Sequence, residues 1–242
     1  MEEKPLYKVK YESDPLISRK SVNPTWLFNM ETDNSDLKSM KAEFCNIIRK
    51  INALEFGTFR LAGGKITPYY VDLRLIPSFP DAFKKVCDFS ADLIDREIGK
   101  QNFDRIAGIP TAGIPFASFI AYRLGKPFLY IRHRIKISGR ERRIEGVLLP
   151  GDNVLLVDDL ITTGHSLGRA ASIIRSEGGV VTDAFVLLDR MEGGAQRLER
   201  EGIKLHSLMR IDEVIERLYE MNAITEDQMN IILSQIKTEK KQ

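Results

Sequence analysis

The sequence predicts an α/β fold, in which a parallel sheet is flanked by helices on both faces. Five short aliphatic runs are too apolar to have one face in water, and segments of helical periodicity such as 114–124 and 166–177 separate them. The length of 242 residues suits one large domain, and 43% hydrophobic residues are enough for its core. The predicted strands are RIAGI from residue 105, PFLYI from 127, NVLLVD from 153, VTDAFVLLD from 181 and IKLHSL from 203.

The segment before these strands predicts an arm, a helix and a hairpin. Residues 1–35 are polar, contain prolines and lack a sustained period, so we expect an extended arm. A helix from Asp36, capped by Ser35 or Asp36, is predicted by an apolar stripe with 3.6-residue spacing that comprises Leu37, Met40, Phe44, Ile47, Ile48, Ile51 and Leu54. The runs FGTFRL and KITPYYVDL, separated by two glycines, predict a β-hairpin.

Helices are also expected after the hairpin and at the C-terminus. A second amphipathic stripe runs to about residue 99 and ends at Gly99, a residue typical of helix C-termini. Two further helices are expected around Val214–Met221 and Glu226–Ile236. We therefore expect one domain over residues 36–242, composed of a small N-terminal subdomain mainly over 36–78, a core of about 79–210 and C-terminal helices over 211–237.

Composition excludes several classes of protein. The 36 Lys and Arg against 34 Asp and Glu leave a net charge of +2, too balanced for the whole surface to bind nucleic acid or membrane. Cys45 and Cys87 have neither the spacing of a zinc site nor the number of a disulfide framework, so two reduced thiols are expected. No apolar run has the length of a membrane span, and the first residues lack the apolar stretch of a signal peptide. A cytoplasmic protein is predicted.

The segment VLLVDDLITTGHS, residues 154–166, carries the strongest functional signal. Asp158 and Asp159 are expected to emerge at the carboxyl end of a buried strand, the edge at which open α/β sheets bind ligands. The following TTGHS opens a helix, whose free N–H groups and positive dipole end can hold an anion. Two acids that accept hydrogen bonds from vicinal hydroxyls beside a phosphate cradle predict a phosphorylated sugar as ligand.

Other interpretations of this segment agree less well with its residues. A Walker-type magnesium site requires GxxxxGK[ST], but Gly64 and Lys65 precede Ile66, and Phe59 stands where the first glycine belongs. A dinucleotide site is disfavoured because the chain contains no Gly-x-Gly. A purely structural turn capped by Thr and Asp stays open, although two adjacent buried acids cost stability unless a ligand uses them.

Four blocks of the sequence resemble one enzyme family. The segment 154–166 resembles the 5-phosphoribosyl 1-diphosphate (PRPP) motif of the type I phosphoribosyltransferases. FRLAGGKITPYYVDLR from residue 59, GIPTAGIP from 108 and LLDR from 187 are similar to orotate phosphoribosyltransferases. The resemblance implies the type I phosphoribosyltransferase fold with a small N-terminal hood. It also implies Mg²⁺-dependent transfer of the 5-phosphoribosyl group from PRPP to orotate, which gives orotidine 5'-monophosphate and pyrophosphate in UMP biosynthesis.

The same resemblance implies a set of site residues. Asp158, Asp159 and Lys136 would be catalytic, and Mg²⁺ would be carried by PRPP and water without a direct protein ligand. Tyr70, Thr162 and Arg190 would bind orotate, although Tyr70 equally suits a core position in a strand. PRPP would be bound by Thr111, Ala112, Gly113, Arg132, His133, Lys136, Ser138, Asp158, Asp159, Leu160, Ile161, Thr162, Thr163, Gly164, His165 and Ser166.

Residues 132–146 form a basic segment with six Lys or Arg and two Glu, a net charge of +4. Such a run is by itself typical of a solvated loop or a weak nucleic-acid patch, but its place between two strands favours a mobile lid over an anion. The resemblance implies that this lid enters the active site of the neighbouring subunit of a homodimer. The chain departs from residues usual in the family, or in some bacterial members, at His133, Ile137, Ser138, Ala62 and Ala112.

Two alternative functions belong to different classes. A PRPP- or nucleotide-sensing regulator could share this fold, but residues 1–35 are too short and proline-rich for the helix-turn-helix that it would need. A phosphoribosyltransferase for another base is the second alternative, and the LLDR and GGKITPYYVDLR blocks count against purines.

Overall fold

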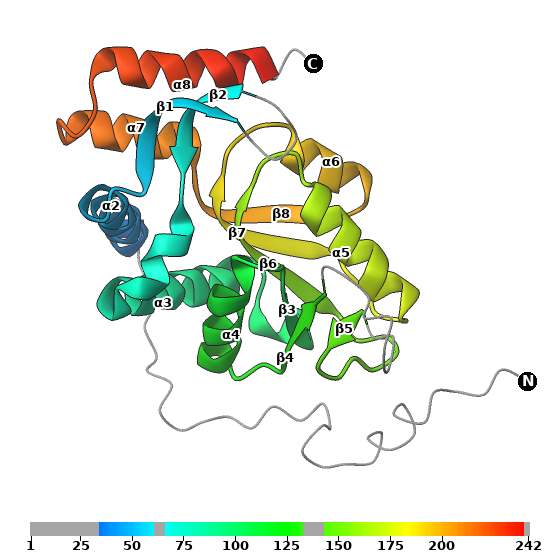
Figure 1. The fold of residues 1–242 in the computed structure, drawn as a ribbon. Helices are drawn as coiled ribbons and strands as arrows, with labels where there is room; N and C mark the ends of the chain where they lie inside the picture. The colour runs from blue at the N-terminus through cyan, green and yellow to red at the C-terminus, as the bar shows by residue number, and fades with distance from the viewer. Residues whose placement is uncertain (1–33, 61–65, 133–142, 240–242) are drawn as a thin grey trace, which may run out of the picture.

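The computed structural model describes residues 34–60, 66–132 and 143–239, which contain a central six-stranded sheet (Figure 1). The strand order is β5-β4-β3-β6-β7-β8, and all neighbours are parallel except β4 and β5. The strands are β3 (Arg105–Gly108), β4 (Phe128–Ile131), β5 (Ile144–Glu145), β6 (Val154–Ile161), β7 (Asp183–Asp189) and β8 (Lys204–Arg210). The predicted fold class is confirmed.

The chain extends the sheet in two opposite directions from its middle strands, β3 and β6. From β3 the chain moves outward to β4, and after β5 it returns across β3 to β6 and then proceeds to β7 and β8. The carboxyl ends of β3 and β6 are therefore neighbours at a topological switch point, the place at which open α/β sheets bind ligands. The register pairs Gly108 with Val157 and Ile161 with Asp189, so the ends of β3, β6 and β7 share one edge.

Helices cover both faces of the sheet, as the doubly apolar strands require. Alternate residues of β6 enter two clusters: Leu155 and Val157 join one face, and Val154 and Leu156 join the other. The first face carries α2 (Asn34–Lys50), α3 (Pro80–Glu97), α4 (Gly113–Leu124) and α7 (Ile211–Glu220). The second carries α5 (His165–Ser176) and α6 (Gly194–Arg200), which lie on the opposite side in Figure 1.

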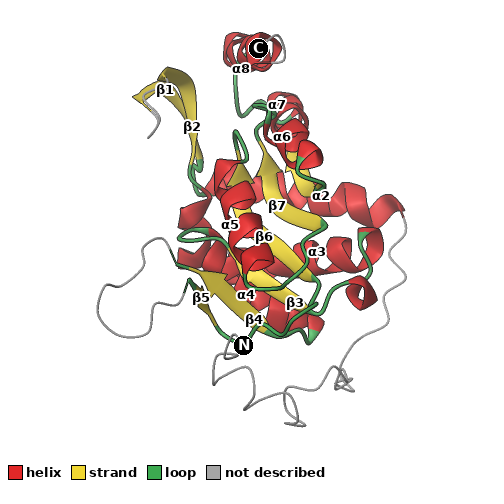
Figure 2. Cartoon of the chain, turned by 90° about the vertical axis from the view of Figure 1, so that its right-hand side faces the viewer, coloured by secondary structure: helices red, strands yellow, loops and turns green. Residues whose placement is uncertain are grey.

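A two-stranded hairpin stands apart from the main sheet, beside the C-terminal helix (Figure 2). It consists of β1 (Leu54–Arg60) and β2 (Ile66–Val71), and a 3-10 helix, η1 (Leu73–Ser78), returns the chain to the core. The helix α8 (Glu226–Glu239) lies along β2 and packs on α7. Within the described ranges no helix is long and apolar enough to cross a membrane.

Most predicted elements are confirmed, but two elements have different boundaries and one strand was not expected. The first helix begins at Asn34 and ends at Lys50, because Leu54 leaves the apolar stripe to pair with Val71 in the hairpin. The strand β6 continues to Ile161, so the two aspartates lie within it. The end of the basic segment, Ile144–Glu145, forms the antiparallel edge strand β5, which the sequence did not predict.

Candidate active site

Two buried carboxylates lie near the carboxyl end of β6. Asp158 and Asp159 are each 8% exposed, and the backbone N–H of Asp159 donates to Asp158 Oδ1 at 2.9 Å. Burial holds the pKa of Asp158 well above its ordinary value, and the neighbouring charge of Asp159 raises it further. Burial also raises the pKa of Asp159, with an opposing effect of the hydrogen bond to Asp158. In the free protein, water therefore solvates the two carboxyl groups poorly. Both are suited to accept hydrogen bonds from the hydroxyl groups of a ligand.

The turn after β3 approaches this acidic pair. Gly113 begins α4, and a Cβ placed on it would lie 2.7 Å from Asp158 Oδ1 and 2.8 Å from the carbonyl oxygen of Val157. Only glycine fits this contact, which brings the backbone of the turn directly against β6. Thr111 is exposed and Ala112 half-buried. The turn of residues 111–113 therefore lies directly beside the aspartate pair at the switch point.

A turn that leads into α5 follows β6. Gly164 precedes α5 with a φ of 76°, and the N–H of Gly168 is bonded to its carbonyl oxygen at 2.9 Å. The N–H groups of the first turn lack helical partners by construction and stand at the positive end of the helix dipole. Thr163, His165 and Ser166 are exposed at this turn, where their side chains can add contacts to a bound phosphate. The sequence prediction of a strand, turn and helix at this place is confirmed.

Some predicted PRPP contacts are restricted by their surroundings. The side chain of Ile161 is buried in the core, and its carbonyl oxygen accepts from the N–H of Arg190 at 3.0 Å. Leu160 and Thr162 are half-buried on either side of it. Arg132 directly follows the carboxyl end of β4, and its guanidinium forms an ion pair with Glu145 at 2.8 Å. His133, Lys136 and Ser138, together with Ala62 and Ile137, lie outside the described residues.

Arg190, which follows β7, is held in a polar cluster under the hairpin. Its side chain is 2% exposed, and Nη2 lies 2.9 Å from Glu192 Oε1. Its guanidinium carbon lies 4.5 Å from the centre of the Tyr69 ring, and Nε donates to the Tyr69 hydroxyl at 3.3 Å. Nη2 also reaches Thr67 Oγ1 at 3.5 Å. Arg190 is thus oriented by residues of β2 as well as by its own loop.

Tyr70, proposed from the sequence as the aromatic wall for the base, points to the other face of β2. Its ring lies 5.5 Å from that of Phe59, and its hydroxyl accepts from Arg74 Nη2 at 2.8 Å. Arg74 also pairs with Asp72, and its charge opposes the upward shift in the pKa of Asp159. The structure therefore brings Tyr69, rather than Tyr70, to Arg190.

Sequence reasoning missed Tyr69, Thr67 and Glu192. A signal for the first two was present, because Thr67, Tyr69 and Val71 alternate along a strand and therefore share one face. All three are buried. No comparable signal distinguishes Glu192, whose contact depends on the turn after β7.

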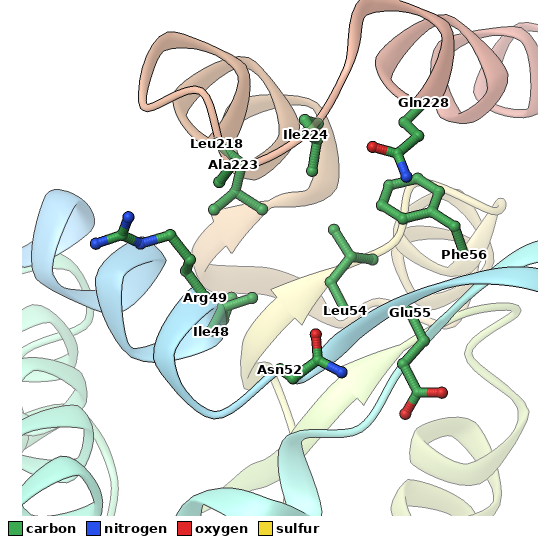
Figure 3. Close-up of a pocket in the computed structure, with 10 residues that line it drawn as sticks. All are labelled: Ile48, Arg49, Asn52, Leu54, Glu55, Phe56, Leu218, Ala223, Ile224 and Gln228. Carbon is green, nitrogen blue, oxygen red and sulfur yellow. The ribbon is translucent and has the colours of Figure 1, made fainter.

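Two further observations limit the location and chemistry of the site. Among the described residues, no group of three or more His, Cys, Asp or Glu side chains is arranged to hold a metal ion by itself. A separate groove lies between α2, β1 and the α7–α8 turn, with Arg49, Asn52 and Gln228 among its lining residues (Figure 3). None of the predicted site residues lines that groove; the described ones lie along the carboxyl edge of the sheet and in β2, so this region is the candidate active site.

Comparison with known proteins gives one consistent family. Residues 78–214 match the model of the phosphoribosyl transferase domain. The orotate phosphoribosyltransferase of Cenarchaeum symbiosum is 42% identical over 186 residues, which cover 77% of this chain and 93% of that protein.

Solved structures agree with this relation. The crystal structure of orotate phosphoribosyltransferase from Aeropyrum pernix has a TM-score of 0.64 and 29% identity, covering 73% of this chain and 99% of that one. The structure of Leishmania donovani UMP synthase has a TM-score of 0.75 and 29% identity over 85% of this chain. This chain spans 44% of the length of that synthase.

Proposed function

This chain belongs to the orotate phosphoribosyltransferase family, and we propose that it transfers the 5-phosphoribosyl group from PRPP to orotate. The products are orotidine 5'-monophosphate and pyrophosphate, and the reaction belongs to pyrimidine nucleotide biosynthesis. The observation that carries this proposal is the convergence of a buried aspartate pair, a helix N-terminus and a buried arginine at one edge of the sheet.

Each part of the candidate site has a proposed role toward PRPP. Asp158 and Asp159 accept hydrogen bonds from the two ribose hydroxyls, which supply the donors that the buried carboxylates need. Residues 162–166 hold the 5-phosphate at the N-terminus of α5, with 160–161 completing the strand end. Residues 111–113 approach the pyrophosphate through backbone atoms, since Gly113 permits close approach to β6.

The base is proposed to bind between the hairpin and the end of β7. Orotate carries a carboxylate, and a guanidinium such as that of Arg190 can pair with it through two hydrogen bonds. Thr162 and Tyr70 are the other proposed base contacts from the sequence. The position of Tyr69 against Arg190 adds a flat apolar surface beside the same guanidinium.

Catalysis is proposed to be electrostatic. The ribosyl group develops positive charge as its bond to pyrophosphate breaks, and the aspartates at the ribose stabilise that charge. Lys136 is proposed to neutralise the leaving pyrophosphate. Mg²⁺ is the proposed cofactor, and when bound with PRPP it supplies further positive charge to the pyrophosphate. An all-oxygen donor set supplied by PRPP and water fits this ion, and we assign it no direct ligand from the chain.

The proposal includes an assembly and a location. We propose a homodimer with shared sites, in which Arg132, His133, Lys136 and Ser138 of one subunit serve the partner's active site. The balanced net charge of +2 supports small-molecule substrates without nucleic-acid or membrane partners. Both cysteines are buried free thiols, which supports a reducing, cytoplasmic location.

We also propose the domain division that the sequence predicts. It comprises the arm 1–35, the hood mainly over 36–78, the core of about 79–210 and the C-terminal helices of 211–237.

The deciding experiment is a difference-absorbance assay with PRPP, Mg²⁺ and orotate. Uracil and hypoxanthine serve as alternative bases. Of these three bases, we expect turnover only with orotate. Turnover with another base but not with orotate would make the chain a phosphoribosyltransferase of different specificity. PRPP binding without turnover on any base would favour the regulator.

A further inference from the structure

The C-terminal helix α8 contacts the polar cluster around Arg190. Ile232 and Ile236 anchor α8 in the main hydrophobic cluster, and Figure 1 shows the helix beside β2. Between these two anchors, Gln235 faces the hairpin, and its Oε1 accepts from Thr67 Oγ1 at 3.1 Å. A helix more than 30 residues downstream of β7 thus provides a polar group to the proposed base-binding region.

Thr67 links this amide to the guanidinium. Its hydroxyl is fully buried and lies 3.1 Å from both Gln235 Oε1 and the carbonyl oxygen of Tyr69. Arg190 Nη2 reaches the same hydroxyl oxygen at 3.5 Å. Because a hydroxyl has one proton, its orientation determines which acceptor it serves and how its lone pairs face Arg190. Gln235 is one of the two groups that set this orientation.

Because this link is buried, it affects the geometry of Arg190 more than a surface contact would. The Nε2 atom of Gln235 is enclosed and makes no hydrogen bond with the described part of the chain. Enclosing an unpaired donor costs free energy, so contacts with the protein, and not hydration by water, hold the amide in this position. Arg190 is 2% exposed, and in such surroundings a neighbour that reorients alters the geometry of the guanidinium strongly.

We propose that Gln235 is a positioning residue for orotate recognition, through which α8 orients Thr67 and thereby Arg190. This inference rests on the proposed function, in which Arg190 pairs with the carboxylate of orotate. A correctly oriented guanidinium binds the base without ordering cost, whereas a loosened one must be ordered by each orotate that binds. The aspartates and the helix that are proposed to hold PRPP do not take part in this link.

The test compares Gln235→Met with Lys237→Ala in steady-state assays of the full chain. Methionine retains the length and apolar stem of glutamine but lacks the amide, and Lys237 is an exposed residue of the same helix. We expect Gln235→Met to raise the KM for orotate by roughly two- to tenfold, the effect of one hydrogen bond, with kcat and the KM for PRPP unchanged. Lys237→Ala should match the wild type in all three constants.

Second variants separate positioning from a structural role. Thr67→Ser keeps the hydroxyl and should keep the orotate KM, whereas Thr67→Val should raise it. Adding Gln235→Met to Thr67→Val should then raise it no further, because both act through one hydroxyl.

Arg190→Ala distinguishes the failure of this inference from that of the proposed function. If it leaves the orotate KM unchanged, the assignment of Arg190 to the base is wrong. If it raises the orotate KM but Gln235→Met does not, or if Gln235→Met raises both KM values equally, the positioning role of Gln235 is overturned.

Discussion

Replacing Asp158 with Asn should have opposite effects on ligand binding and on stability. The substitution removes the charge but keeps Oδ1, which can still accept from the N–H of Asp159 at 2.9 Å. PRPP loses a charged acceptor for a ribose hydroxyl, worth about 1.5–3 kcal/mol, so its affinity should fall roughly 10- to 150-fold. Asp159→Asn should weaken PRPP binding in the same range. Equilibrium titration with PRPP measures both changes.

Stability should change in the other direction for Asp158→Asn. Because burial raises the pKa of Asp158 in the folded state, its stabilising contribution is present at low pH and is lost as pH rises through the raised value. At neutral pH the wild type therefore carries the cost of a buried charge that the variant lacks. A difference of about 1 kcal/mol would raise Tm by roughly 2–4 °C at pH 7, and the gain should shrink near pH 4.

Thermal unfolding followed by circular dichroism at pH 7 and pH 4 measures the change in stability, and the PRPP titration measures the change in affinity. Asp95→Asn is the matched control, because it removes an exposed aspartate of α3 outside the candidate site and should not alter PRPP affinity. Wild-type PRPP affinity in both Asp158→Asn and Asp159→Asn would refute the assignment of the pair to the ribose. A lower Tm at pH 7 with no recovery at pH 4 would refute the argument from burial.

Three further outcomes are expected. Gly113→Ala places a methyl group 2.7 Å from Asp158 Oδ1, so Tm and PRPP affinity should both fall, and unchanged values would show that the turn does not abut β6. His133→Lys restores a cation usual in the family, so pyrophosphate should inhibit at lower concentration, and weaker inhibition would remove His133 from the site. Lys136→Ala and Asp159→Asn proteins, each nearly inactive, should recover about a quarter of wild-type sites when unfolded and refolded together, because half of random dimers are hybrid and one of their two sites is intact. No recovery, with hybrids confirmed by native mass spectrometry, would place Lys136 in its own subunit's site.

Local patterns in the sequence were sufficient for the fold class and for the strand, turn and helix around the two aspartates. Doubly apolar runs predicted strands buried on both faces, and the segment 154–166 predicted acids and an anion cradle at one strand end. Such features depend on a few neighbouring residues. The hydrophobic period, the helix-capping residues and the change from strand to helix can therefore be recognised in the sequence. The resemblance to a family added the base and the reaction, which periodicity alone does not specify.

The partners of Arg190 were decided only by the tertiary structure. Alternation along β2 separates Tyr69 from Tyr70 but does not say which face will be covered, and packing of the hairpin buried the face of Tyr69. Leu54 fitted the helical stripe until its pairing with Val71 made it a strand residue. Gln235 reaches Thr67 across 168 residues of sequence. Contacts between segments so far apart depend on how whole elements pack, and no local pattern encodes that geometry.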